Sequence, residues 1–146
     1  MEEKEIVYVD MDGTICDFEG AFHRDLAENP AIKFPQSQHR FWVNLKPIPG
    51  ALEAYKKLEE KYDVYILTSP STRNVLCYTE KAEWIREHLG FEALKKLIIS
   101  KNKSLMMGKY LIDDRAVNGA ENFKGELLLI HSEKFPDWNS VLEKIM

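Results

Sequence analysis

The sequence predicts an α/β fold in which helices pack against a mostly parallel sheet of five strands. Two observations lead to this prediction. Short runs of apolar, β-favouring residues alternate along the chain with segments of helical periodicity. The strand candidates are almost continuously apolar, as expected for strands buried on both faces of a sheet. We therefore expect right-handed crossovers, with functional groups at the carboxyl ends of the strands.

Five segments have the composition of strands. The first is unusual because it runs directly into two carboxylates. The strand candidates are Ile6–Asp10 (IVYVD), Val64–Thr68 (VYILT), Leu97–Ser100 (LIIS), Tyr110–Asp113 (YLID) and Glu126–His131 (ELLLIH).

The spacing of apolar residues predicts three helices in the core. The first follows Pro49, and the second stops at Gly90, a residue type favoured at helix C-termini. The predicted helices are Ala51–Tyr62, Thr79–Leu89 and Asp137–Ile145. No internal repeat, low-complexity tract or charge block marks a further domain.

The segment between Phe18 and Pro47 interrupts this alternation. It is too long for a simple loop and contains a helical stretch at 19–28, but no obvious strand. We interpret it as a small helical cap at 18–45, inserted after the first strand. Residues 1–17 and 46–146 would then form the core domain.

Length and charge restrict the class of protein. At 146 residues, 45% of them hydrophobic, the chain suits one domain with a real core. The net charge of −4 argues against a partner that is a nucleic-acid polymer or a membrane surface. The two cysteines suggest neither a disulfide framework nor a zinc site. The apolar run after the acidic N-terminus is too short for a signal peptide, so we expect a cytoplasmic protein.

Polar side chains suited to phosphoryl transfer lie at or after the ends of the predicted strands. In a parallel sheet these ends meet at one edge, so the side chains are expected to share one crevice. They are Asp10 and Asp12 after the first strand, Thr68 and Ser69 at the second, Lys103 after the third, and Asp113 and Asp114 at the fourth.

The chemistry of this set indicates a metal-dependent phosphatase. Several carboxylates without soft ligands suit Mg²⁺, which prefers oxygen donors. One carboxylate of the Asp10 and Asp12 pair can attack phosphorus to form an aspartyl phosphate, and the other can protonate the leaving oxygen. Thr68 and Ser69 would donate hydrogen bonds to the phosphoryl oxygens, whose charge Lys103 would balance.

Each of these features also has a purely structural explanation. Asp and Gly favour turns, so both acidic pairs could simply mark turns. Ser69 followed by Pro70 could begin a helix, and Lys103 could be a solvated surface lysine. Four such coincidences, in this order along one sheet, are less plausible than a single shared site.

Four short motifs, in order, resemble those of haloacid-dehalogenase (HAD) superfamily phosphatases, and more closely those of the 5'(3')-deoxyribonucleotidases. The similarity covers about residues 6–115 and implies a HAD-like Rossmannoid three-layer sandwich. The motifs are DMDGT at 10–14, TSP at 68–70, the lysine of KNKS at 103 and LIDDR at 111–115. Further matches are DFEG at 17–20, FWV at 41–43, PIPGALEA at 47–54 and YTEKAEWI at 78–85.

The resemblance also implies roles for individual residues. Asp10 would be the nucleophile and a Mg²⁺ ligand, and Asp12 the general acid and base, which binds the metal through its backbone carbonyl. Asp114 would bind the metal directly and Asp113 through water, while Thr68 and Lys103 hold the phosphate.

Phe18, Phe41, Trp42 and Val43 match positions that line the nucleotide pocket of the family. Phe41 and Trp42 are adjacent, so on a helix they would point about 100° apart. Either one ring then faces the crevice and stacks on a base, or both are buried between cap and core.

The chain departs from the animal members of the family between FWV and KPIPG. Only Asn44 and Leu45 stand there, in place of a longer insertion that supplies another pocket aromatic. The expected substrate is a nucleoside monophosphate, and another small phosphorylated metabolite remains the alternative. A receiver-type signalling module would need an acid at the end of the third strand, where LIISKNK has none. A binding protein without activity is a further alternative, although no motif is missing.

Overall fold

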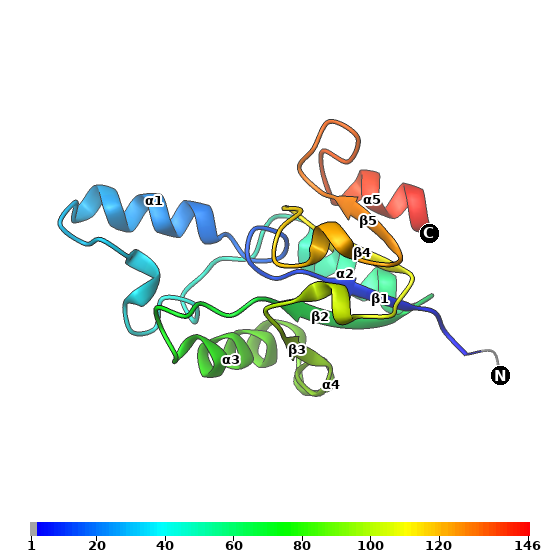
Figure 1. Cartoon of the computed structure of the whole chain (residues 1–146), viewed down its shortest axis with the longest axis horizontal. Coiled ribbons are helices and arrows are strands. Elements are labelled where there is room, and N and C mark those ends of the chain that lie inside the picture. Colours follow the sequence, from blue (N-terminus) through cyan, green and yellow to red (C-terminus); the bar gives the residue numbers. More distant parts are fainter. Residues whose placement is uncertain (1–2) are drawn as a thin grey trace.

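The computed structural model describes residues 3–146 and contains one sheet of five parallel strands (Figure 1). Residues 1–2 of the expected core lie outside the described part of the chain. The spatial order of the strands is β3-β2-β1-β4-β5. The strands are β1 (Ile6–Val9), β2 (Asp63–Thr68), β3 (Leu97–Ile99), β4 (Tyr110–Asp113) and β5 (Glu126–Leu129).

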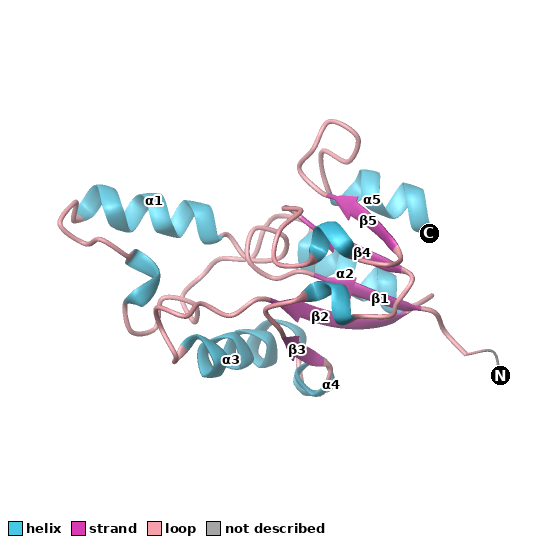
Figure 2. Ribbon diagram, viewed as in Figure 1, coloured by secondary structure: helices cyan, strands magenta, loops and turns pink. Residues whose placement is uncertain are grey.

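The first strand of the chain lies at the centre of the sheet. Val9 aligns with Ile66 on β2 and with Ile112 on β4. The next residue, Asp10, donates its backbone N–H to the carbonyl of Ile112 at 2.9 Å. All five strand arrows point to the side of the molecule where α1 lies (Figure 2). The end of β1 therefore places Asp10 in the middle of the edge where the predicted site residues were expected to meet.

Alternate residues of the strands pack on opposite faces of the sheet. Val7 and Val9 belong to the larger hydrophobic cluster, which includes buried residues of α2, α3 and α5. Tyr8 and Leu111 point into a smaller cluster with Phe123. This second face is covered by short 3₁₀ helices, so the third layer of the sandwich is thin. Burial on both faces explains why the strands read as continuous apolar runs, and the predicted α/β fold is confirmed.

The helices agree with the prediction within a few residues. The short α4 was missed because Gly90, with φ of 97°, ends one helix and begins the next at once. The helices are α1 (Phe18–Glu28), α2 (Ala51–Glu59), α3 (Cys77–Leu89), α4 (Phe91–Lys95) and α5 (Trp138–Ile145), with 3₁₀ turns η1 (Pro35–Ser37), η2 (Lys103–Leu105) and η3 (Ala120–Asn122). Among the described residues, no helix is long and apolar enough to cross a membrane.

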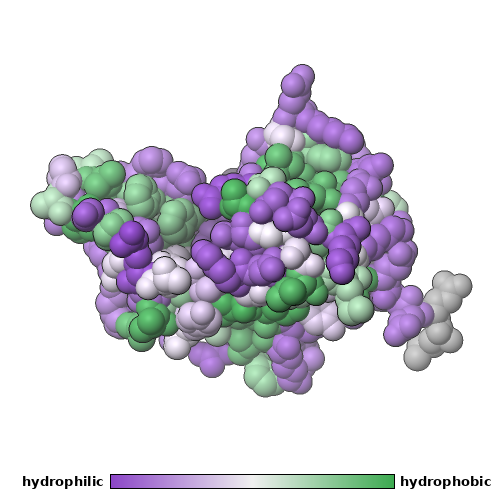
Figure 3. Space-filling view, viewed as in Figure 1, coloured by the Kyte–Doolittle hydropathy of each residue, from purple (hydrophilic) through white to green (hydrophobic). Residues whose placement is uncertain are grey.

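The segment at 18–45 contains α1, η1 and a series of turns. Figure 1 shows α1 extending away from the sheet. Hydrophobic residues are visible along α1 in Figure 3, beside a mainly hydrophilic centre of the same face. The assumption that Phe41 and Trp42 lie on a helix is wrong, because both lie in turns after Arg40, which adopts a left-handed φ of 66°. Their directions are therefore set by the turn and not by helical spacing.

The C-terminal helix is tied to the first turn after β1. The indole N–H of Trp138, the first residue of α5, donates to the backbone carbonyl of Thr14 at 2.9 Å. Asp137 and Ser140 form a reciprocal capping box that fixes the start of this helix. The turn that follows β1 is thus held by a residue 124 positions away.

Candidate active site

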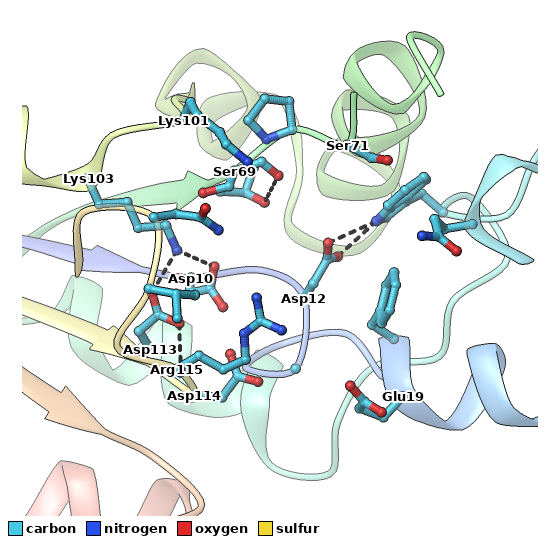
Figure 4. A pocket seen from close by; sticks show the side chains of 18 residues that line it. Asp10, Asp12, Glu19, Ser69, Ser71, Lys101, Lys103, Asp113, Asp114 and Arg115 are labelled. Carbon is cyan, nitrogen blue, oxygen red and sulfur yellow. Dashed lines mark hydrogen bonds and ion pairs between the residues drawn. The ribbon is translucent and has the colours of Figure 1, made fainter. Parts of the chain in front are cut away.

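A pocket of about 310 Å³ opens at the carboxyl ends of the strands. Residues from five separate stretches of the chain, at 10–19, 36–42, 68–71, 101–103 and 113–118, line it, and Figure 4 draws their side chains. It brings together seven of the predicted site residues, namely Asp10, Asp12, Thr68, Ser69, Lys103, Asp113 and Asp114. The alternative in which Ser69 and Pro70 begin a helix is wrong, since α3 begins only at Cys77.

Part of the pocket lining is a buried ionic cluster. The Nζ atom of Lys103 lies 2.7 Å from Oδ1 of Asp10 and 2.7 Å from Oδ2 of Asp113 (Figure 4). The Thr14 hydroxyl donates to the other oxygen of Asp10 at 3.0 Å. Lys103, Asp10 and Asp113 are each 5% exposed or less, so Lys103 is not a solvated surface lysine.

The charges in this cluster determine which carboxyl group stays ionised. Burial opposes the charged form of Asp10, but the Lys103 ammonium outweighs it and holds the pKa of Asp10 below its usual value. Burial likewise opposes the charge of Lys103, and the two carboxylates beside it raise its pKa. At neutral pH the cluster therefore contains an ionised Asp10 paired with a charged Lys103.

The remaining two acids, the buried Asp113 and the half-buried Asp114, lie beside the negative charge of Asp10. Burial, followed by the charge of Asp10, raises the pKa of Asp113 to about 6 and that of Asp114 to about 8. Asp10, Asp113 and Asp114 can each offer an oxygen, and these atoms all lie within 4.8 Å of one another. Three oxygen donors that repel one another fit a hard divalent cation.

Gly13 explains how the turn after β1 comes so close to Asp114. Its φ is +82°, a left-handed conformation that residues with side chains rarely adopt. A Cβ atom built on Gly13 would lie 2.1 Å from Oδ2 of Asp114. The glycine of the DMDGT motif is thus required both by backbone conformation and by the space that Asp114 occupies.

Hydroxyl groups line the side of the pocket formed by the end of β2. The Thr68 hydroxyl oxygen accepts a bond from the Lys81 ammonium at 2.6 Å, and its own proton makes only a long contact, 3.5 Å, with the Ser69 carbonyl. The hydroxyl of Ser69 is buried and has no hydrogen-bond partner among the described residues. A buried polar atom without a partner costs free energy unless a ligand satisfies it. Both hydroxyl groups are therefore available to an anion in the pocket.

Asp12 is held apart from the ionic cluster. The indole N–H of Trp42 lies 2.9 and 3.1 Å from its two oxygens, and the Lys81 ammonium lies 3.2 Å from Oδ2. The thiol of Cys16 is 3.4 Å from Oδ1. Burial and the charge of Asp12 raise the pKa of Cys16, so this thiol is neutral. Asp12 keeps 25% of its side chain exposed, toward the pocket that it lines.

The predicted pocket aromatics are placed unequally. Phe18 and Trp42 line the pocket, whereas Phe41 and Val43 are not among its lining residues. Phe41 is 5% exposed and belongs to the hydrophobic core, with its ring edge-on to Phe18 at 5.4 Å. The shared motif FWV thus contains one pocket residue, at Trp42, and two that the structure places elsewhere.

Sequence reasoning missed several residues of the site. Thr14 stands in DMDGT, and Lys81 stands in the YTEKAEWI stretch, but no local pattern shows which atoms they contact. Lys81 is fully buried on α3, where a lysine is rarely found unless it is paired. Glu19, Gln36 and Arg115 also line the pocket. These three residues could be predicted only from the way in which α1, η1 and the end of β4 approach one another, which the sequence does not reveal.

Comparison with known proteins adds an independent finding. A family model described as "5' nucleotidase, deoxy (Pyrimidine), cytosolic type C protein" matches residues 28–136. A protein of Vibrio phage KVP40, assigned to the 5'(3')-deoxyribonucleotidases, is 36% identical over 146 residues. The aligned region covers 96% of this chain and 84% of the phage protein. The human cytosolic-type 5'(3')-deoxyribonucleotidase is 30% identical over 167 residues, which cover 93% of this chain and 78% of the human one.

Solved structures agree on the fold. YfnB of Bacillus subtilis, described as a HAD-hydrolase bound to magnesium, superposes with a TM-score of 0.70. The superposition covers 99% of each chain at 12% sequence identity. Identity this low supports the shared architecture and nothing finer.

Proposed function

Because the chain belongs to the 5'(3')-deoxyribonucleotidase family of HAD-superfamily phosphoric monoester hydrolases, we propose that it hydrolyses nucleoside monophosphates through an aspartyl phosphate on Asp10. The observation that carries this proposal is the state of Asp10. Its carboxylate is buried at the base of the pocket, yet Lys103 keeps it ionised. An ionised carboxylate facing a pocket of this kind is a suitable nucleophile.

The reaction proceeds in two steps. In the first, an oxygen of Asp10 bonds to phosphorus while the ester bond breaks, and the departing alcohol oxygen takes a proton from Asp12. In the second, water attacks the phosphorus of the aspartyl phosphate and gives a proton to Asp12. Inorganic phosphate leaves, and Asp10 is regenerated. Atoms and protons balance, and the net reaction is hydrolysis of a phosphomonoester.

The phosphoryl group would be held by residues on both sides of the pocket. Thr68 would exchange its long 3.5 Å contact for a bond to a phosphoryl oxygen, Ser69 would donate its unpartnered hydroxyl proton to another, and Lys103 would offset the charge. This arrangement accounts for the unpartnered hydroxyl of Ser69.

The acidic cluster fits Mg²⁺ as the cofactor. Asp10 and Asp114 would bind it directly, and Asp12 through its backbone carbonyl. Both oxygens of Asp113 are already engaged, one by Lys103 and one by the backbone N–H of Arg115 at 3.1 Å, which favours its contact through water. When bound, the metal would stabilise negative charge on the phosphoryl oxygens and on the acids around it.

The segment at 18–45 would act as the cap of this site. It contributes Phe18, Glu19, Gln36 and Trp42 to the pocket lining. Closing over the phosphate, such a cap would exclude bulk water and select the organic part of the substrate. Residues 3–17 and 46–146 would form the catalytic core.

A panel of phosphomonoesters tests the proposal. Phosphate release should be measured on nucleoside monophosphates and on sugar phosphates, with Mg²⁺ and with chelator. We expect the highest kcat/KM on a nucleoside monophosphate and no turnover in chelator. A clear preference for base-free sugar phosphates would instead favour a small phosphorylated metabolite, as the short cap at Asn44 and Leu45 allows. Full activity in chelator would contradict the metal site.

A further inference from the structure

The side chain of Asp12 makes contacts that could not be predicted from its position after the end of β1. Both of its oxygens face the indole N–H of Trp42, at 2.9 and 3.1 Å. Lys81 reaches it from α3 and also bonds to the Thr68 hydroxyl and the Ser69 carbonyl, at 2.6 and 2.7 Å. Lys81 is fully buried, and these three bonds engage all of its donors. Asp12 is therefore held from two directions, by the cap segment and by α3.

Glu80 holds the turn that carries Trp42. Its two oxygens accept the backbone N–H of Arg40 at 2.9 Å and that of Trp42 at 3.0 Å. Glu80 is 5% exposed and does not line the pocket, so it has no direct access to a substrate. Arg40 takes a left-handed φ of 66°, and the Glu80 carboxylate satisfies the N–H groups that this turn leaves unpaired within the backbone.

The Trp42 ring is unsuited to stacking on a base. Only 1% of the residue is exposed, and the ring packs against Phe41 and Phe18 at centroid distances of 5.2 and 6.0 Å. Its polar edge, in contrast, meets the one acid that is expected to transfer a proton. What Trp42 presents to the site is an N–H group and not an aromatic face.

We propose that Trp42 and Glu80 are positioning residues for the general acid: Glu80 fixes the turn, and the Trp42 indole N–H fixes the carboxyl group of Asp12. This inference rests on the proposed function, because Asp12 is a general acid only there. An indole N–H is always a donor and does not titrate near neutral pH. It can stay bonded to one oxygen of Asp12 whether or not the other oxygen carries a proton.

Substrates with different leaving groups can distinguish positioning of the general acid from a purely structural role of Trp42 and Glu80. An alcohol leaving group needs a proton as the ester bond breaks, whereas p-nitrophenolate is stable without one. A misplaced Asp12 should therefore lower kcat/KM, which ends at release of the leaving group, for alkyl phosphates and much less for p-nitrophenyl phosphate. The later hydrolysis of the aspartyl phosphate, in which Asp12 accepts a proton from water, is common to all substrates and does not enter this ratio. Deoxyribose 5-phosphate has the same leaving oxygen as a nucleoside 5'-monophosphate but lacks the base.

The first test is Trp42→Phe, which removes the N–H and keeps an aromatic ring. General acids contribute about 10²- to 10⁴-fold, and we expect a loss of part of this, about 10- to 100-fold in kcat/KM, on both alkyl phosphates. On p-nitrophenyl phosphate the loss should be under about 3-fold. A loss confined to the nucleotide would show that Trp42 contacts the base, and equal losses on all three substrates would show a general disruption. Either result would overturn the proposal.

The second test is Glu80→Gln, compared with Glu87→Gln, the same change at an exposed position of the same helix. We expect Glu80→Gln to lower the ratio of the alkyl to the nitrophenyl kcat/KM and Glu87→Gln to leave it unchanged. Because Glu80 acts through Trp42, adding Glu80→Gln to Trp42→Phe should lower the ratio little further. A full additive loss in the double variant would contradict this route. Should Glu80→Gln fail to fold, Trp42→Phe decides alone.

Asp12→Asn distinguishes failure of this inference from failure of the proposed function. It should lower alkyl phosphate turnover by at least about 100-fold. If it does not, Asp12 is no general acid, and both the proposed mechanism and the positioning role fall. If it does, but Trp42→Phe and Glu80→Gln leave the substrate ratio unchanged, only the positioning role is refuted.

Discussion

The two sides of the pocket are built in different ways. On the metal side, Asp10, Lys103, Asp113 and Asp114 stand at or just after strand ends, and the sheet alone brings them together. On the acid side, Asp12 is held by Trp42 from the cap segment and by Lys81 from α3. The metal side follows from the convergence of strand ends at one edge of a parallel sheet. The acid side depends instead on how the turn at Trp42 packs against α3.

This difference has a consequence for function. Residues on the metal side bear the charges of the reaction, so changing one should abolish turnover on every substrate. Residues on the acid side position Asp12, which gives its proton to the leaving group in the first step. Changing them should therefore lower kcat/KM, which reports the steps up to release of the leaving group, only where the leaving group needs that proton. The following experiments test that division, beginning with the largest effect.

The largest loss is expected from Asp10→Asn, because an amide cannot form the acyl phosphate. Turnover should fall by about 10⁴-fold or more, equal to ~5.4 kcal/mol of barrier, on alkyl and nitrophenyl esters alike. Steady-state kinetics on both esters measure this, with the melting temperature confirming that the variant folds. Near-normal Mg²⁺-dependent turnover would exclude Asp10 as the nucleophile.

Loss of a metal ligand should have the next largest effect. In Asp114→Ala the Mg²⁺ concentration for half-maximal activity should rise on the order of 100-fold, the change that about 2.7 kcal/mol of lost binding free energy produces. Titration of activity with Mg²⁺ after chelation measures it. As a control, Glu126→Ala removes an exposed acid at the start of β5 that does not line the pocket, and its Mg²⁺ requirement should not change. An unchanged requirement in Asp114→Ala would remove this residue from the metal site.

Protons should compete with the metal. The pKa of Asp114 is raised to about 8, so the metal-free fold prefers the protonated form of this carboxyl group. Protonated Asp114 therefore contributes to the stability of the metal-free fold at low pH, and this contribution is lost as the pH rises from about 4 toward 8. At pH 6 a cation must displace that proton, which weakens its apparent affinity by up to about 100-fold. Mg²⁺ should therefore raise the melting temperature more at pH 8.5 than at pH 6. The opposite order would contradict the metal assignment.

The smallest effects should separate two aromatics of the cap. Phe18 lines the pocket, and stacking of a base on it would be worth about 1–3 kcal/mol, so Phe18→Ala should lower nucleotide kcat/KM by about 5- to 150-fold. Phe41 is a core residue, and Phe41→Ala should cost about 3–5 kcal/mol of stability. Measuring kcat/KM on deoxyribose 5-phosphate, which has no base, together with the melting temperature of each variant distinguishes a pocket contact from a core contact. If Phe41→Ala specifically lowers nucleotide turnover in a protein that remains folded, it belongs to the pocket after all.

The sequence sufficed to predict the sheet, because each strand is a local apolar run, and the metal side, because strand ends converge. It did not suffice for the acid side. Lys81 lies on α3, and its position along this helix does not by itself predict which atoms its ammonium group contacts. The turn at Phe41 and Trp42 depends on Arg40 adopting a left-handed conformation and on Glu80, 38 residues beyond Trp42, accepting its N–H. Such contacts become visible only when the cap segment and α3 are seen together.

The bond from Trp138 to Thr14 links the active site to a helix far along the chain. Thr14 contacts Asp10, and Lys103 reaches the same carboxylate from 93 residues away, so the site needs segments from both halves of the chain. Contacts between residues so distant in sequence form late and slowly. A chain still emerging from the ribosome would hold β1 and its nucleophile long before α5 and Trp138 follow. In refolding experiments, regained hydrolysis would therefore report the assembly of segments from both halves of the chain and not the formation of β1 alone.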